Sequence, residues 1–331
     1  MRVLCGVLCG LWLVCGGMAQ AAESAGCGAA VGGNEAAWAV TPADAHHALP
    51  NDRRPPQRRE PATLLPPLPP EAVGLVRRVD TSERVLALTF DLCELATNTT
   101  GCDMDICNFL RREGIAATLF MGGKWMRTHA RRVRQLLTVP YFEIANHAWS
   151  HGNCALLSPA GLRAQVLWTQ AQYELLREEA LREAGAGMHI PPVPTLFRLP
   201  YGRCTPQALR GIADMGLQVI QWDVTGESGA DNRDPQRARA EARKLAAQTK
   251  PGSIILFHAN LVPRGTAVLL RAYVEEMRAR GYAFSTVSDL LRRGRPVRSQ
   301  DGYFSRPGDN VQWDGRFGPS GTGERTPFTG E

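Results

Sequence analysis

Residues 84–91 read Arg-Val-Leu-Ala-Leu-Thr-Phe-Asp. The first seven form a short apolar run of the kind that favours a β-strand, and Asp91 follows the run directly. A second strand-like run, 115–120, comes after a segment at 103–113 with helical spacing, which Gly114 ends. A strand, a helix and another strand in this order indicate a parallel sheet.

The same alternation continues along the chain to residue 287. Ser158 followed by Pro159 is typical of a helix start, and Pro206 and Pro235 open two further helices. The sequence predicts helices at 128–137, from 158 to beyond 180, and at 206–215, 235–250 and 266–280, and strands at 141–145, 195–198, 217–222, 253–258 and 283–287.

These elements predict one α/β domain over residues 81–296. About seven strands in roughly 215 residues suit a (β/α) barrel that is distorted or incomplete. A doubly wound open sheet is the alternative architecture. No Gly-x-Gly-x-x-Gly follows the first strand, which removes the main reason to prefer it.

The two ends of the chain differ in composition from this domain. Residues 1–21 are predicted to be a signal peptide, with Arg2 before an apolar run and small residues at Ala19 and Ala21. Residues 22–80 are rich in proline and arginine and predict a disordered linker. Residues 297–331 predict a disordered tail. We therefore expect an exported protein, periplasmic or secreted.

Composition limits the possible partners and the redox state. Hydrophobic residues make up 44% of the 331 residues, and the net charge is +6. This charge is too small to indicate nucleic-acid binding, and it fits weak attraction to an anionic polymer. Signal cleavage would leave six cysteines, which could form three disulfides or act as small buried hydrophobes: Cys27, Cys93, Cys102, Cys107, Cys154 and Cys204.

Polar side chains recur where the predicted strands end. The set is Asp91, His147, His151, Arg198, Trp222, Asp223 and His258. Because the carboxyl ends of parallel strands lie on one face of a barrel, we expect these side chains to gather there, where catalytic groups are found.

The pair His147 and His151 has the spacing that puts two imidazoles on one side of a helical turn, where they can share a divalent metal. Each candidate also has an ordinary structural interpretation. Asp91 could cap a turn, Arg198 could serve an ion pair, and His258 could be a satisfied core histidine. Their common position at strand ends favours the functional interpretation.

Five blocks of this sequence resemble those of the polysaccharide deacetylases, the family with the NodB-homology domain. They are Thr89-Phe90-Asp91, Asn146-His147 through His151, Arg198-Leu199-Pro200-Tyr201-Gly202, Trp222-Asp223-Val224 and Leu256-Phe257-His258. The resemblance covers most of residues 80–296, and its second and third blocks together are specific.

The resemblance implies hydrolysis of an acetamide to acetate and a free amino sugar. It implies that His147 and His151 hold a divalent metal, most often zinc, which polarises the carbonyl and lowers the pKa of water. Asp91 would be the general base. Arg198 would pair with Asp91 and keep it ionised.

The resemblance also assigns the remaining catalytic groups. The backbone N–H of Tyr201 would help to hold the oxyanion, and His258 would protonate the departing amine. The family places an acid beside this histidine. Asp223, Glu227 and Asp231 compete for that role, and Asp223 or Glu227 is favoured.

One position departs from the family pattern. The family has a second aspartate, a metal ligand, directly after the base, whereas this chain has Leu92. Glu94, with its longer side chain, is our hypothesis for the missing oxygen ligand. Asp103 and Asp105 lie farther along the chain and are weaker candidates.

The expected substrate is an N-acetylated cell-envelope glycan such as peptidoglycan, with no nucleic-acid partner and no membrane span after signal cleavage. A metal-poor glycan-binding module, an O-acetyl esterase and a small-amide hydrolase are the alternatives, and Leu92 favours the first of them. Trp125, Trp149 and Trp222 could stack on sugar rings or could be ordinary core residues.

Overall fold

The computed structural model describes residues 35–45, 49, 50, 52, 54–94, 97–185, 187–227 and 232–320. All of them belong to one compact unit, Gly33–Glu331. The predicted signal peptide at 1–21 lies outside the described residues, as do Cys27 and the tail from residue 321.

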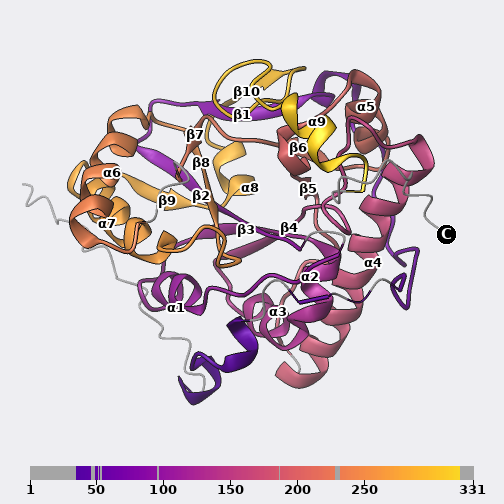
Figure 1. Cartoon of the computed structure of the whole chain (residues 1–331), viewed down its shortest axis with the longest axis horizontal. Helices are drawn as coiled ribbons and strands as arrows, with labels where there is room; N and C mark the ends of the chain where they lie inside the picture. Colours follow the sequence, from indigo (N-terminus) through magenta and orange to yellow (C-terminus); the bar gives the residue numbers. More distant parts are fainter. Residues whose placement is uncertain are drawn as a thin grey trace, which may run out of the picture. The chain divides into compact units, whose positions relative to one another are not determined.

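One sheet organises this unit (Figure 1). Its strands are β1 (Leu75–Asp80), β2 (Val85–Leu92), β3 (Ala117–Met121), β4 (Phe142–Asn146), β5 (Leu196–Phe197), β6 (Gln218–Ile220), β7 (Val224–Thr225), β8 (Ile254–His258), β9 (Ala283–Ser285) and β10 (Arg295–Ser299). The order is β10-β1-β6-β5-β4-β3-β2-β8-β7, and β9 pairs with β2. Every pair except β1–β10 is parallel.

This topology confirms the predicted incomplete barrel. Within the described residues the path of paired strands is open, from β10 at one end to β7 at the other. The sheet has ten strands rather than about seven. The additional strands β1, β7 and β10 lie in proline-rich, very short or polar segments, so only their pairing with neighbouring strands reveals them.

The helices follow the predicted alternation closely. They are α1 (Met104–Arg112), α2 (Gly123–Thr128), α3 (Ala130–Leu137), α4 (Pro159–Ala184), α5 (Pro206–Asp214), α6 (Pro235–Gln248), α7 (Thr266–Ala279), α8 (Val287–Leu291) and α9 (Gln312–Phe317). The predicted cap of α4 is confirmed, since the Ser158 hydroxyl accepts from the N–H of Gly161 at 3.1 Å. Helices α6 and α7 pack side by side, and α4 runs along α2 and α3 (Figure 1).

Strand β2 lies in the core, which explains why its sequence is continuously apolar and does not alternate between apolar and polar residues. All eight residues of β2 are buried, because the strand has neighbours on both edges and packing on both faces. Trp125, Trp149 and Trp222 are 0%, 1% and 2% exposed. These tryptophans are therefore core residues, and they offer no open face to a sugar.

The segment before β1 differs from the disordered linker predicted over 22–80. Its described part packs against the domain. Asp44 forms a buried ion pair with Arg132, with 2.6 Å between Oδ2 and Nη2. Glu174 on α4 accepts from the backbone N–H groups of Ala62 and Thr63 at 2.6 and 2.8 Å. Prolines stiffen this segment, and the N–H groups of Ala62, Thr63 and Leu68 find partners on the domain.

The described part of the predicted tail, 297–320, is also packed rather than disordered. Strand β10 pairs with β1. Asp314 on α9 accepts from Nη2 of Arg203 at 2.6 Å, and the ring of Phe317 stacks on Tyr201 at 4.9 Å between centroids. This segment therefore lies next to the third family block.

The five described cysteines are free thiols. Four of them are buried, and Cys204 is partly exposed. The expectation of disulfides is therefore not met within the described residues, and most of these thiols pack as small apolar groups. No helix in the described part of the chain has the length and apolar character needed to cross a bilayer.

Candidate active site

The carboxyl ends of the parallel strands bring the predicted residues together. Asp91 on β2 pairs in register with His258 on β8. Asn146, the last residue of β4, pairs with Phe197 on β5, so His147 and Arg198 follow neighbouring strands. The sequence prediction that these side chains share one edge of the sheet agrees with this arrangement.

Asp91 is held by the side chain of Arg198. Nη1 of Arg198 donates to Oδ1 of Asp91 at 2.9 Å, and both side chains are buried. Burial by itself would raise the pKa of Asp91, but its electrostatic interactions with His147, Arg198 and His258 outweigh it, so this pKa lies below its ordinary value. Asp91 is therefore ionised at neutral pH and can accept a proton.

Arg198 is fixed by more than this ion pair. It is 0% exposed, and it also donates to the backbone carbonyls of Ile220 and Gln221. Its guanidinium lies over the Phe120 ring, 3.9 Å from the centroid. A buried guanidinium with this many partners holds one orientation, which fixes the carboxylate beside it.

His147 and His151 come together on a loop, and the predicted helical turn is wrong. Residues 147–153 are non-helical, and Ala148 and His151 have φ of 62° and 58°. These left-handed residues turn the chain so that the two imidazole centroids lie 4.9 Å apart. Such strain costs about 1–3 kcal/mol per residue and is concentrated at functional sites.

The histidine nitrogen atoms are presented for a ligand. Nδ1 of His147 donates to the Arg198 carbonyl at 2.9 Å, which leaves the lone pair on Nε2. Nε2 of His147 and Nδ1 of His151 are buried and make no hydrogen bond. Burial lowers the pKa of both histidines, so both are neutral at pH 7. Neutral imidazoles with unused lone pairs fit a metal ion.

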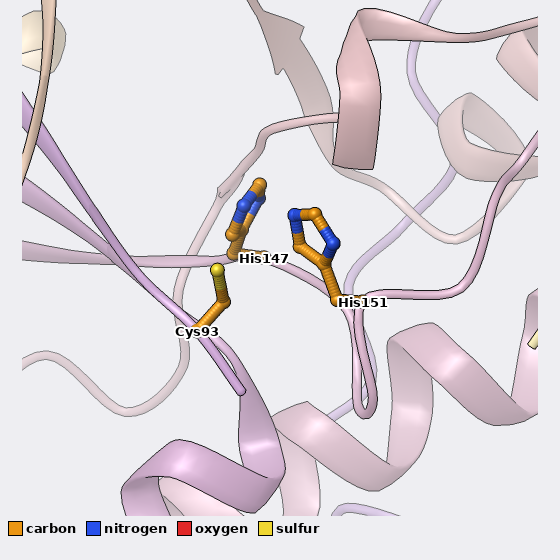
Figure 2. Close-up of side chains that lie close together, drawn as sticks. All are labelled: Cys93, His147 and His151. Atoms are coloured by element: carbon orange, nitrogen blue, oxygen red, sulfur yellow. The ribbon is translucent and has the colours of Figure 1, made fainter. Parts of the chain in front are cut away.

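A third donor, Cys93, lies beside these histidines. Its Sγ and one ring nitrogen each of His147 and His151 lie within 4.8 Å of one another. Figure 2 shows the thiol pointing toward both rings. Burial raises the pKa of this thiol above its usual range, and a bound cation would reverse that effect because a coordinated thiol is deprotonated.

The acidic residues that the sequence suggested as metal ligands do not belong to this cluster of donors. Glu94 is buried next to Cys93 in the chain, but the donor cluster found among the described residues consists of Cys93, His147 and His151. Asp103 caps α1, where it accepts from the backbone N–H groups of Asp105 and Ile106. Burial raises the pKa of Asp103 to about 6.

His258 is oriented by Glu227. Its Nδ1 lies 2.7 Å from Oε2 of Glu227, whose Oε1 accepts from the backbone N–H of His258 and the hydroxyl of Thr266, both at 2.8 Å. Burial lowers the pKa of His258, but the charge and hydrogen bond of Glu227 outweigh it, so this pKa lies above its ordinary value. Glu227 therefore favours the protonated form of His258, which is the form that can donate a proton.

Asp223, the other favoured acid, is used elsewhere. Its two oxygens accept from the hydroxyl of Ser253 at 2.8 Å and the backbone N–H of Ile254 at 2.9 Å. It therefore fixes the start of β8 and does not contact His258. Asp231 lies outside the described residues.

Tyr201 borders the histidine loop in a left-handed conformation, with φ of 59°. Its ring meets His151 edge to face, with 4.5 Å between centroids. Its carbonyl accepts from Nδ2 of Asn310 at 3.0 Å, and Phe317 stacks on its other side. The C-terminal segment therefore supports this position, which the tail's composition did not reveal.

A model of the polysaccharide deacetylase family matches residues 78–220. Over these residues the chain is similar to the polysaccharide deacetylases. The matched segment contains Asp91, both histidines of the loop, and Arg198, whereas Glu227 and His258 lie beyond its end.

Curated relatives and solved structures extend the family match. A peptidoglycan-N-acetylglucosamine deacetylase of Bacillus cereus is 27% identical over 67% of this chain and 95% of its own length. A chitooligosaccharide deacetylase of Rhizobium leguminosarum is 24% identical, over 49% of this chain and 64% of its own length. A solved peptidoglycan N-acetylglucosamine deacetylase shares the fold, with a TM-score of 0.55, 21% identity, and coverage of 69% of this chain and 97% of its own.

Proposed function

We propose that this protein is an exported, metal-dependent N-deacetylase that removes acetyl groups from an N-acetylated cell-envelope polysaccharide such as peptidoglycan. One observation carries the proposal: Asp91 held by Arg198 and His258 held by Glu227 lie in register on neighbouring strands, beside the two histidines. This arrangement places an ionised base beside an imidazole whose protonated form is favoured.

The reaction adds water to the acetamide carbonyl and breaks its carbon–nitrogen bond. A divalent metal held by His147 and His151 would polarise that carbonyl and lower the pKa of water. Asp91 takes the proton of the attacking water, while Arg198 keeps its carboxylate in place. The backbone N–H of Tyr201 would donate to the developing oxyanion, a contribution typically worth roughly 2.7–4 kcal/mol.

His258 completes the reaction by giving its proton to the departing nitrogen. The charge of Glu227 stabilises the imidazolium before this step, which favours the form of His258 that carries the proton. The products are acetate and a glycan with a free amino group.

The named relatives support the choice of substrate class, since they are deacetylases of peptidoglycan and of chitooligosaccharide. The net charge of +6 fits attraction to an anionic envelope polymer. The signal-like residues 1–21 support export to the compartment where such a polymer occurs.

The test is acetate release by the purified protein from peptidoglycan and from N-acetylglucosamine oligomers, with metal content measured on the same sample. Release that needs both Asp91 and His147, judged from Asp91→Asn and His147→Ala, is the expected result. Release only from O-acetylated sugars would replace the amide substrate by an ester.

A glycan-binding module without turnover is the second candidate, and Leu92 is the observation that favours it. This position carries an apolar side chain, 0% exposed, where the family has a metal ligand. Glycan binding with neither bound metal nor acetate release would select this candidate and reject the first.

A further inference from the structure

Cys93 directly follows β2, and its thiol lies beside the two histidines. Side chains alternate along an extended chain, so residues two apart share a face. Leu92 is buried in the apolar core. Cys93, two residues after Asp91, points instead toward His147 and His151 (Figure 2).

The spacing of the three donor atoms suits one ion. They lie within 4.8 Å of one another. A tetrahedral ion with typical zinc–sulfur and zinc–nitrogen bonds holds its donors roughly 3.3–3.6 Å apart. Side-chain adjustments of about 1 Å would therefore close the site, and three protein ligands leave the fourth position open, as in catalytic zinc sites.

The surroundings of the sulfur fit this role. Nδ2 of Asn260 lies 3.7 Å from Sγ of Cys93 and 3.2 Å from its carbonyl oxygen, and Asn260 is buried. A donor beside a thiolate is the kind of supporting contact that holds a metal ligand in place. His147 has a supporting contact of the same kind, since its Nδ1 donates to the carbonyl of Arg198.

We infer that Cys93 is the third protein ligand and that Cys93, His147 and His151 form a site for zinc. A thiolate with two imidazoles is a soft donor set, which favours zinc over the harder ions Mg²⁺ and Mn²⁺ that prefer oxygen. The inference rests on the proposed function because it concerns the same metal. It assigns the ligand to a thiolate in place of the Glu94 carboxylate.

The test replaces the metal of the full chain by Co²⁺, whose bond to a thiolate gives strong near-ultraviolet charge-transfer absorption. We expect this absorption in the wild type, in Glu94→Gln and in the control Cys204→Ser, which changes a thiol away from the cluster. Cys93→Ser should lose the absorption and bind metal more than about 100-fold more weakly, since even supporting contacts to ligands typically contribute 10- to 100-fold.

A second variant at the same position distinguishes loss of the thiolate ligand from misfolding of the protein. Cys93→Asp offers an oxygen ligand, so it should keep one metal per chain while losing the charge-transfer absorption. A wild-type cobalt protein without thiolate absorption would overturn the inference, as would loss of metal in Glu94→Gln with retention in Cys93→Ser. Absorption without acetate release would leave the site standing and refute the proposed function instead.

Discussion

Replacing Glu227 by glutamine tests the acid half of the site. The carboxylate of Glu227 lies 2.7 Å from Nδ1 of His258 and raises the pKa of that imidazole. The backbone N–H of His258 can only donate, so the amide oxygen would stay with it and the amide NH₂ would face Nδ1. Both the lost charge and this new donor disfavour the imidazolium.

The size of the effect follows from the hydrogen bond. A hydrogen bond to a charged group contributes roughly 1.5–3 kcal/mol, and one pKa unit corresponds to about 1.36 kcal/mol. The pKa of His258 should therefore fall by about 1–2 units. Since the acid must be protonated, the alkaline limb of kcat/KM moves to lower pH, and at a pH above both pKa values the rate falls roughly 10- to 100-fold.

The assay is the pH profile of kcat/KM for acetate release, and Asp223→Asn is the matched control. Asp223 contacts Ser253 and Ile254 rather than the histidine, so its substitution should leave the alkaline limb in place. An unmoved limb in Glu227→Gln, or an equal shift in the control, would refute the assignment of the acid pair.

Three further outcomes follow from the structure. Asp91→Asn should lower kcat by about 10²- to 10⁴-fold with unchanged metal content, and acetate release with elemental analysis checks this. His147→Ala should lose metal and activity together, measured in the same way; an active, metal-free variant would contradict the proposed reaction. Asp44→Ala should lower the free energy of unfolding by about 3–5 kcal/mol, because it leaves Arg132 buried without its partner, whereas Asp52→Ala removes an exposed ion pair and should cost less than about 1 kcal/mol. Urea denaturation compares these two, and equal losses would contradict the difference in burial.

The order of elements was readable because it depends on local patterns. The apolar runs of β2 and β8 and the capped start of α4 are visible in the sequence, and the structure contains each of them. Strand β1 was missed because it directly follows the proline-rich segment and two arginines interrupt its apolar residues, and β10 was missed because its residues are mostly polar. They exist through pairing with each other, which is a contact between distant parts of the chain.

The residues of the candidate site also divide into those that the sequence could predict and those that it could not. Asp91, His147 and His258 could be named because each follows a strand, and parallel strands bring their ends together. The roles of Glu94 and Asp223 could not be judged from spacing, because loops decide where those carboxylates point. Cys93 carried one signal, its position directly after the first strand and two residues after Asp91.

The sequence by itself therefore determined the strand–helix alternation, the edge of the sheet that carries the polar residues, and the resemblance to the polysaccharide deacetylases. Tertiary structure alone decided which donor stands beside the histidines and which acid orients His258. It also decided that the proline-rich and C-terminal segments pack on the domain. The physical reason is that hydrophobic periodicity fixes the face on which a side chain emerges, whereas ligand and ion-pair contacts depend on distances between residues far apart in the chain.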